Sequence, residues 1–229
     1  MILFIDTAFD KTTLALKQGG TIYQEIISER INISQVIIER TRSLLKKAQL
    51  KKENIKIIAF NQGPGNFTSL RISLAFIKAI AFHLKIPVIS FNSFQVLAMS
   101  ALHINKKYPI IVAVDARMNE VYWVKYKNFS DIFSKNNIYN LTSENFLYKE
   151  LEDFNGKEMN LIKNNSNILQ EYNKVGPLVK AITIENCNID LLSIFKGIEK
   201  KIECNDLRNI HDINLLYMRN NIAKKIKNE

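Results

Sequence analysis

Short apolar runs separated by turn residues open the chain and predict a β-meander. Met1–Thr7 is apolar up to its final Asp-Thr, Thr12–Lys17 has the composition of a strand, and Gly19-Gly20 predicts a turn into a third strand at Thr21–Ile27. The period then changes, because the apolar residues of Ile33–Gln49 fall on one helical face. The chain therefore begins with three strands and an amphipathic helix.

Strands and helices alternate after this point. We expect a strand at Ile55–Phe60, a helix at Phe67–Leu84, a strand at Pro87–Phe91 and a helix at Ser93–Leu102. Asn92 or Ser93 would cap the last of these helices. Alternation of this kind after a meander indicates an α/β domain with a mixed sheet.

The second half repeats the opening of the first. Lys106–Pro109 is a plausible boundary, and a buried strand at Ile110–Asp115 turns at Ala116–Asn119 into a second strand at Glu120–Tyr126. This strand, turn and strand hint at two related lobes. The rest is rich in Asn and Lys, and the helices expected there lie near Ser143–Leu151, Asn188–Lys200 and Asp212–Ile226.

The helix at Phe67–Leu84 has almost no polar face. Its charged or titratable residues are only Arg71, Lys78 and His83. A helix that is apolar all round is buried all round, whereas a helix on a sheet normally keeps one face in water. The surplus apolar face must therefore meet another helix, either on a partner or, in the simpler alternative, within the chain.

Composition fits a packed globular protein. Of 229 residues, 47% are hydrophobic and 24% charged, which argues against disorder of the whole chain. No apolar stretch is expected to reach the length that crosses a bilayer, and the N-terminus has the pattern of a strand rather than a signal peptide. Cys187 and Cys204 lie far apart, so we expect free thiols and a cytoplasmic location.

The net charge of +10 raises the question of nucleic-acid binding. Basic residues cluster in two places, at Lys46, Lys47, Lys51 and Lys52 and again at Lys224, Lys225 and Lys227. Such clusters suit RNA phosphates and, equally, the solvation of a helix end. Charge alone does not separate the two.

The glycine-rich segment Gly63–Ser69 joins a strand to a helix. Such a loop can present N–H groups to an anion, but the P-loop spacing is missing and Pro64 has no N–H to donate. A tight turn with Asn66 or Thr68 as the helix cap is the favoured interpretation.

Few other residues suggest chemistry. Asp6 and Asp115 end strands and could hold a metal or water, or simply form turns, and Arg117 and Glu120 could pair with each other or with Asp115. The histidines have no metal-binding spacing, there is no GxSxG elbow, and glycine is scattered in the second half; the histidines are His83, His103 and His211.

Four segments, in order along the chain, resemble the TsaB (YeaZ) family of tRNA threonylcarbamoyladenosine biosynthesis proteins. They are Ile5–Thr7, Gln62–Arg71, Val114–Tyr122 and Leu216–Lys224. The motif residues that carry the resemblance are Asp6, Gly63, Pro64, Gly65, Phe67, Asp115, Arg117, Glu120, Tyr217 and Arg219. Departures from the family pattern are Ser69 and Ser73 in place of glycine and Ile33 in place of histidine.

The resemblance implies an α/β, two-lobed actin-like ATPase (ASKHA) fold with mixed sheets flanked by helices. The lobes would be residues 1–106, with the interface helices, and a smaller, diverged lobe of residues 107–229, whose C-terminal helix could pack back on the first. It also implies a non-catalytic scaffold with no catalytic, cofactor-binding or metal-binding residue. Its partners would be the catalytic subunit TsaD and the ATPase TsaE; a homodimer is an alternative state, any tRNA contact would be indirect, and no membrane is involved.

Family members use the two helices of the first lobe for pairing. The corresponding interface residues here are Ile33, Ile37, Arg40, Leu44, Thr68, Arg71, Leu74, Ala75, Ile77 and Lys78. Three alternatives remain: an actin-like enzyme that binds or hydrolyses ATP, a glycoprotease-like peptidase, and an independent RNA-binding protein. No peptidase constellation and no glycine-rich adenosine loop is visible in the sequence.

Overall fold

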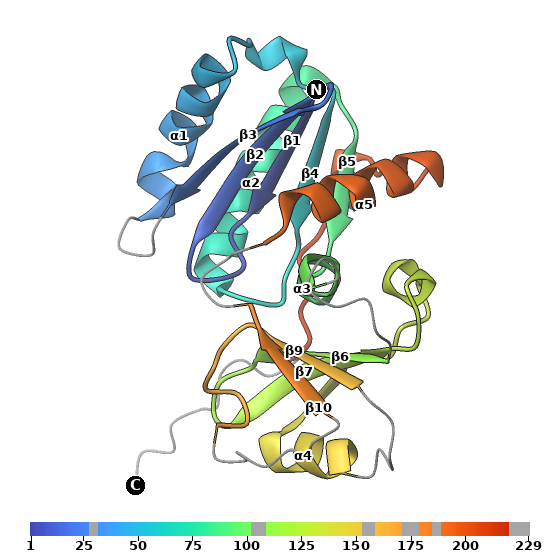
Figure 1. Ribbon diagram of the computed structural model, residues 1–229. Coiled ribbons are helices and arrows are strands. Elements are labelled where there is room, and N and C mark those ends of the chain that lie inside the picture. Colours follow the sequence, from blue (N-terminus) through green and yellow to red (C-terminus); the bar gives the residue numbers. More distant parts are fainter. Residues whose placement is uncertain (28–31, 102–108, 153–158, 171–178, 185–188, 220–229) are drawn as a thin grey trace, which may run out of the picture.

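Two mixed five-stranded sheets form the framework of the protein (Figure 1). The computed structural model describes residues 1–27, 32–101, 109–152, 159–170, 179–184 and 189–219. The first sheet has the order β3-β2-β1-β4-β5, with strands Thr21–Ile27, Thr12–Gln18, Ile2–Asp6, Ile57–Asn61 and Val88–Phe91. The strands β3, β2 and β1 are antiparallel, whereas β1, β4 and β5 run parallel.

The second sheet repeats this order, as β8-β7-β6-β9-β10. Its strands are Asn140–Ser143, Glu120–Tyr126, Ile110–Asp115, Met159–Lys163 and Val179–Thr183. Again a three-stranded meander continues into two parallel strands. The hint of two related lobes is therefore confirmed, and so is the predicted two-lobed α/β fold with mixed sheets.

Helices cover both faces of the first sheet because both faces of its strands are apolar. Leu3 and Ile5 face α1 (Ile33–Lys47) and α2 (Phe67–Leu84), while Phe4 between them faces α3 (Ser93–Ala101) and α5 (Leu191–Glu203). Helix α4 (Glu144–Glu152) covers the outer face of the second sheet. The central position of α3 explains why all nine of its residues are buried.

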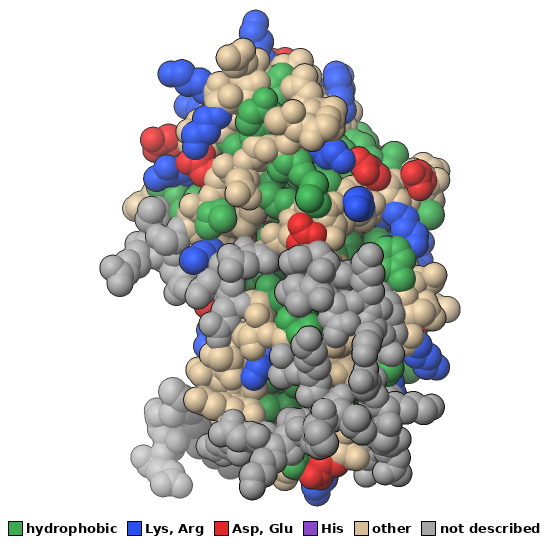
Figure 2. Space-filling view, viewed as in Figure 1, with side chains coloured by type: hydrophobic (Ala, Val, Ile, Leu, Met, Phe, Trp, Pro, Cys, Tyr) green, Lys and Arg blue, Asp and Glu red, His purple; other side chains and the backbone are tan. Residues whose placement is uncertain are grey.

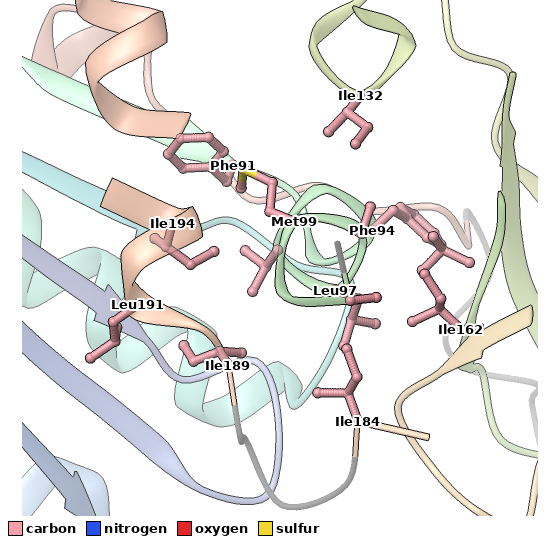
Figure 3. Packing of buried hydrophobic residues seen from close by; sticks show 14 of the residues in the cluster. Phe91, Phe94, Leu97, Met99, Ile132, Ile162, Ile184, Ile189, Leu191 and Ile194 are labelled. Atoms are coloured by element: carbon pink, nitrogen blue, oxygen red, sulfur yellow. The ribbon is translucent and has the colours of Figure 1, made fainter. Parts of the chain in front are cut away.

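One apolar cluster joins the two lobes through α3. Met99 lies beside Phe91 of the first sheet, and Phe94 lies toward Ile162 of the second (Figure 3). Asn92 caps this helix through the backbone N–H of Gln95, and the Gln95 side chain accepts a hydrogen bond from the backbone N–H of Asn92 in return. The predicted cap is confirmed.

The C-terminal segment corrects the sequence prediction. A 3₁₀ turn covers Ile210–Asp212, residues 213–219 form no helix or strand, and residues 220–226 of the predicted helix lie outside the described residues. Contacts with the first lobe hold this segment in a non-helical form, since Ile213 is fully buried there and the Leu216 N–H donates to the Gln62 carbonyl at 2.9 Å. Local helical preference is weaker than these contacts.

Helix α2 corrects two further expectations. By length and composition it could cross a bilayer, contrary to the expectation from the sequence, and it is the one such helix among the described residues. The core helix of a soluble protein can meet the same criteria of length and composition. Helix α2 is also not buried all round, because only Leu70, Ser73, Ile77 and Ala81 are buried in it. Helix α1 covers part of its surplus apolar face and leaves the rest exposed.

Candidate functional site

Helix α2 presents an exposed stripe on the outer face of the first lobe. The stripe residues recur at helical spacing and are Thr68, Arg71, Ala75, Ala79 and Phe82, all of them exposed. Phe82 is 69% exposed, and Ile38 of the neighbouring helix α1 is 52% exposed. We call the α2 stripe, together with Ile38, the docking surface.

The ten predicted interface residues differ in exposure. Ile33, Ile37, Leu44 and Ile77 are buried in the core of this chain, so in this fold they support the docking surface from beneath and cannot contact a partner. Arg40 is partly exposed and pairs with Glu25 at 3.2 Å. The remaining five are exposed or half-buried: Thr68, Arg71, Leu74, Ala75 and Lys78. Ala79, Phe82 and Ile38 are also exposed but were not among the predicted residues, although the helical spacing from Ala75 points to the first two.

The Gly63–Phe67 loop is built for close approach rather than for anion binding. A Cβ on Gly65 would lie 2.1 Å from the Ala8 carbonyl oxygen, and the Asn66 N–H donates to that same oxygen at 2.7 Å. The Asn66 side chain caps α2 by accepting from the Ser69 N–H at 3.2 Å. The interpretation as a tight turn with Asn66 as the cap is confirmed.

Asp6 forms part of a buried polar network at the ends of β1 and β4. One of its carboxylate oxygens accepts from the Ala8 N–H at 2.9 Å and the other from the Asn61 amide at 3.1 Å. Asn61 in turn accepts from the Gly63 N–H and from the Ser93 hydroxyl, at 3.0 and 3.1 Å. Burial raises the pKa of Asp6 to about 6, although these two hydrogen bonds oppose the rise.

A pH-dependent stability follows from this raised pKa. The contribution of Asp6 to the free energy of unfolding is fully present below its ordinary pKa of 3.8 and is lost as the pH rises through about 6. The loss amounts to about 3 kcal/mol. Urea unfolding of the wild type and of Asp6→Asn between pH 4 and 7.5 should show it as a pH-dependent difference between the two proteins.

A constant difference between these two proteins over that range would contradict the assignment. If Asp6→Asn does not fold, a ¹³C NMR titration of the wild-type Asp6 carboxyl gives the same information, and its midpoint should lie near 6.

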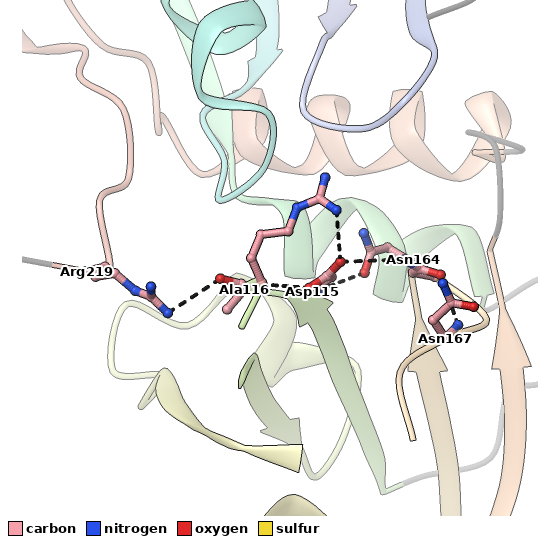
Figure 4. A network of polar contacts seen from close by, with 7 residues as sticks. Asp115, Ala116, Asn164, Asn167 and Arg219 are labelled. Atoms are coloured by element: carbon pink, nitrogen blue, oxygen red, sulfur yellow. Dashed lines mark hydrogen bonds and ion pairs between the residues drawn. The ribbon is translucent and has the colours of Figure 1, made fainter. Parts of the chain in front are cut away.

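The turn between β6 and β7 brings the other motif residues together (Figure 4). The Asp115 carboxylate accepts from the Arg117 N–H at 2.7 Å, and the Arg117 guanidinium lies 3.6 Å from its second oxygen. Asp115 is therefore a turn former that pairs with Arg117, one of the arrangements considered above. Glu120 pairs with Arg219, which also donates to the Ala116 carbonyl at 3.4 Å.

Tyr217 connects the C-terminal segment to the docking surface. Its ring packs against Phe67 with a centroid distance of 5.9 Å, and its hydroxyl accepts from Arg71 at 3.4 Å. The Arg71 guanidinium lies 3.8 Å from the centroid of the Phe67 ring. Residues 213–219 therefore run from the docking helix to the turn of the second lobe.

The inventory for catalysis is small. A cleft of about 410 Å³ lies between the Gly65–Thr68 loop and the Asp115–Arg117 turn, with Asp10 as a further carboxylate in its wall. Within the described part of the chain, no three His, Cys, Asp or Glu side chains gather as metal ligands.

His83 and His211 line one hollow, which the sequence did not suggest, whereas His103 lies outside the described residues. Cys204 carries an exposed free thiol, and Cys187 also lies outside the described residues.

Several Lys and Arg side chains lie over the upper end of the first lobe (Figure 2), and the first basic cluster lies where α1 ends. Lys46 and Lys47 end α1, while Lys51 and Lys52 flank or begin the 3₁₀ helix Lys52–Asn54. Lys47 pairs with Glu25 at 3.3 Å. The second cluster, at residues 224–227, lies outside the described residues.

Comparisons with known proteins agree with these motifs. The family model of TsaD, the tRNA N6-adenosine threonylcarbamoyltransferase, matches residues 11–180. A TsaB protein of Buchnera aphidicola from Schizaphis graminum is 33% identical over 128 residues, which span 55% of this chain and 60% of that protein. A second Buchnera TsaB, from Acyrthosiphon pisum, is 24% identical over 95% of this chain and 97% of its own length.

A solved structure supports the fold. YeaZ from Pseudomonas aeruginosa superimposes with a TM-score of 0.74 at 19% identity, over 95% of this chain and 99% of that one. The likeness in fold therefore extends through both lobes. From the family model, the relatives and the shared fold together, the chain belongs to the TsaB (YeaZ) family of tRNA threonylcarbamoyladenosine biosynthesis proteins, within the wider family that the TsaD model describes.

Proposed function

We propose that this chain is a non-catalytic scaffold subunit for threonylcarbamoyl transfer to tRNA. The modified base would be the adenosine next to the anticodon in tRNAs that read codons starting with A. The chain acts by binding the catalytic subunit TsaD through the docking surface and holding it in its active state. TsaE completes the assembly in the cytoplasm, and a homodimer through the same surface is the alternative resting state.

The exposed apolar stripe of α2 is the observation that carries this proposal. Its Ala75, Ala79 and Phe82 face outward with no other element of the described chain over them. An apolar helix face that is left exposed and flanked by charged residues marks a protein–protein contact. Arg71 next to Ala75 within the stripe and Lys78 beside the stripe supply such charges.

The internal use of the motif residues supports a non-catalytic role. Both carboxylate oxygens of Asp6 accept hydrogen bonds, and Asp6 is only 2% exposed. The N–H groups of Gly63 and Asn66 are likewise taken by Asn61 and Ala8. Groups that are engaged in this way hold the fold together and are not free to contact a substrate.

Reconstitution tests the proposal. Threonylcarbamoyl transfer to an unmodified tRNA transcript is measured with TsaD and TsaE, with and without this chain. We expect transfer to require the chain, while the chain alone neither hydrolyses ATP nor cleaves a peptide substrate. Transfer that proceeds equally fast without the chain would overturn the scaffold role.

The cleft of about 410 Å³ favours one alternative, an actin-like enzyme that binds ATP. A nucleotide titration of the isolated chain separates the two. Saturable ATP binding with hydrolysis supports the enzyme, whereas neither is expected of the scaffold.

A further inference from the structure

A basic hollow at the end of α5 belongs neither to the docking surface nor to the cleft between the motifs. It has a volume of about 520 Å³. Its walls come from α5, from the loop after the 3₁₀ helix Ser130–Phe133, and from the segment that follows α5. The residues that matter are Phe133, Lys135, Lys200, Lys201, Asp206 and Arg208.

Cations outnumber carboxylates in this hollow. Its four cations face two carboxylates, those of Asp206 and Asp212. Lys201 binds Asp206 directly at 2.7 Å, with its ammonium held 5.0 Å above the Phe91 ring. Lys201 is therefore a structural residue, and the other three cations line the hollow that contains the Lys201–Asp206 ion pair.

The pKa of Asp206 reports the field inside the hollow. Burial acts to raise this pKa, but the hydrogen bond from Lys201 and the charges of Lys201, Arg208 and Lys135 hold it below its usual range. Three cations from three segments thus stabilise one anionic group. A second anion at the mouth of the hollow would meet the same field.

Aromatic rings fix one of the cations at the rim. The Lys200 ammonium lies 4.7 Å from the Phe129 ring centroid and 4.5 Å from that of Phe133. The two rings meet edge to face at 5.4 Å, and Phe129 is 44% exposed. A cation held beside an exposed ring suits a ligand that has both phosphates and planar bases.

The α5 wall of the hollow and the docking surface lie on opposite sides of the first sheet, whereas Arg208 lies at the sheet edge beside β5 and shares a second hollow with Phe82. Helix α5 covers one face of this sheet, while α1 and α2 cover the other (Figure 1). A protein seated on the α2 stripe therefore leaves the rim residues Lys135 and Lys200 accessible. A protein on the α2 stripe and an RNA against Lys135 and Lys200 can therefore be bound together.

We propose that the basic hollow binds the RNA backbone, with phosphates against Lys135, Lys200 and Arg208 and an unpaired base against Phe129. In identifying this RNA as tRNA, the inference rests on the proposed function. It assigns the chain a direct contact with tRNA, beyond the indirect one implied by the family resemblance. The net charge of +10 aids the approach of any polyanion, and the hollow adds to it a cation fixed beside two aromatic rings.

The test compares two double variants of equal charge change. A fluorescein-labelled, unmodified tRNA transcript is titrated with the full chain, and anisotropy gives the affinity over a series of NaCl concentrations. Lys135→Glu with Lys200→Glu should weaken binding about tenfold or more at about 0.1 M salt. The slope of the log of the association constant against the log of the salt concentration should become less steep by about 2. Lys46→Glu with Lys51→Glu, neither of which lines the hollow, should leave most of the affinity intact.

Two outcomes overturn the inference. Equal losses of RNA affinity in both double variants would show that RNA binding depends on net charge rather than on the hollow. An unchanged affinity in the Lys135 and Lys200 variant would show that the hollow does not bind RNA and would favour an acidic protein as its ligand. The same variants are tested for TsaD binding and transfer, which separates this inference from the proposed function. If the wild type supports transfer but the Lys135 and Lys200 variant keeps its RNA affinity, the inference alone is wrong. If the wild type supports no transfer but the Lys135 and Lys200 variant, unlike the control, loses RNA affinity, the proposed function alone is wrong.

Discussion

Ala75→Lys is expected to weaken binding to TsaD by at least about a hundredfold while the chain stays folded. Ala75 is exposed in the middle of the α2 stripe, and lysine is a good helix former, so the helix itself should tolerate the change. Arg71 and Lys78, one turn away on either side, offer the new charge no counter-ion. An unpaired charge enclosed in an apolar interface costs about 3–5 kcal/mol, which corresponds to that loss of affinity.

A second variant of opposite sign makes this prediction sharper. Ala79→Glu, one turn along the same stripe, should also weaken binding, whereas simple charge attraction would move the two affinities in opposite directions. Glu150→Lys on the exposed face of α4 is the control and should bind like the wild type. Isothermal titration calorimetry measures the affinity of all three variants for TsaD. Wild-type affinity in both Ala75→Lys and Ala79→Glu would rule out the docking surface. Ile77 cannot serve here, because it is fully buried and a charge there would unfold the protein.

Gly65→Ala is expected to destabilise the protein by about 3 kcal/mol or more. The added Cβ would lie 2.1 Å from the Ala8 carbonyl oxygen and 2.8 Å from its carbon, and both are backbone atoms that no rotamer change can move. The loop must therefore shift, and the hydrogen bond from Asn66 to Ala8 is lost with it. Urea unfolding at pH 7.5 measures the change.

Gly20→Ala is the matched control for this substitution. Gly20 lies in the turn between β2 and β3, where a Cβ meets nothing within 4 Å, and its φ is not positive. We expect its unfolding free energy to stay within about 0.5 kcal/mol of the wild type. Similar stabilities for the two alanine variants would show that the loop accommodates a side chain after all.

The elements with strong local signals were predictable from the sequence. Helix α2 and strands β6 and β7 have the bounds that periodicity predicts, because sustained apolar patterns and a capping asparagine define them. Strands β8, β9 and β10 were missed, since short runs in an Asn- and Lys-rich region are selected by pairing with distant strands. The same long-range effect keeps residues 213–219 from forming the predicted helix.

The candidate site was predictable only in part. An apolar helix does not reveal which of its faces the rest of the chain covers, so Ile77 and Ala75 received the same assignment although one is buried and the other exposed. The partner of Glu120 could not be found either, because Arg219 is 99 residues away along the chain. The close approach of Gly65 to Ala8 likewise depends on tertiary structure that spacing does not contain.

The position of α5 has a consequence for biosynthesis. The last strand of the first sheet ends at Phe91, yet Phe4, Ala59 and Phe91 are covered by a helix that begins only at Leu191. At about 5–20 residues per second, a ribosome needs about 5–20 seconds to add those hundred residues. During that time α3 is the one helix available to cover this face, and the apolar area that α5 will bury stays exposed, as surface of the kind that chaperones bind. The first lobe to be translated is thus among the last parts to finish folding.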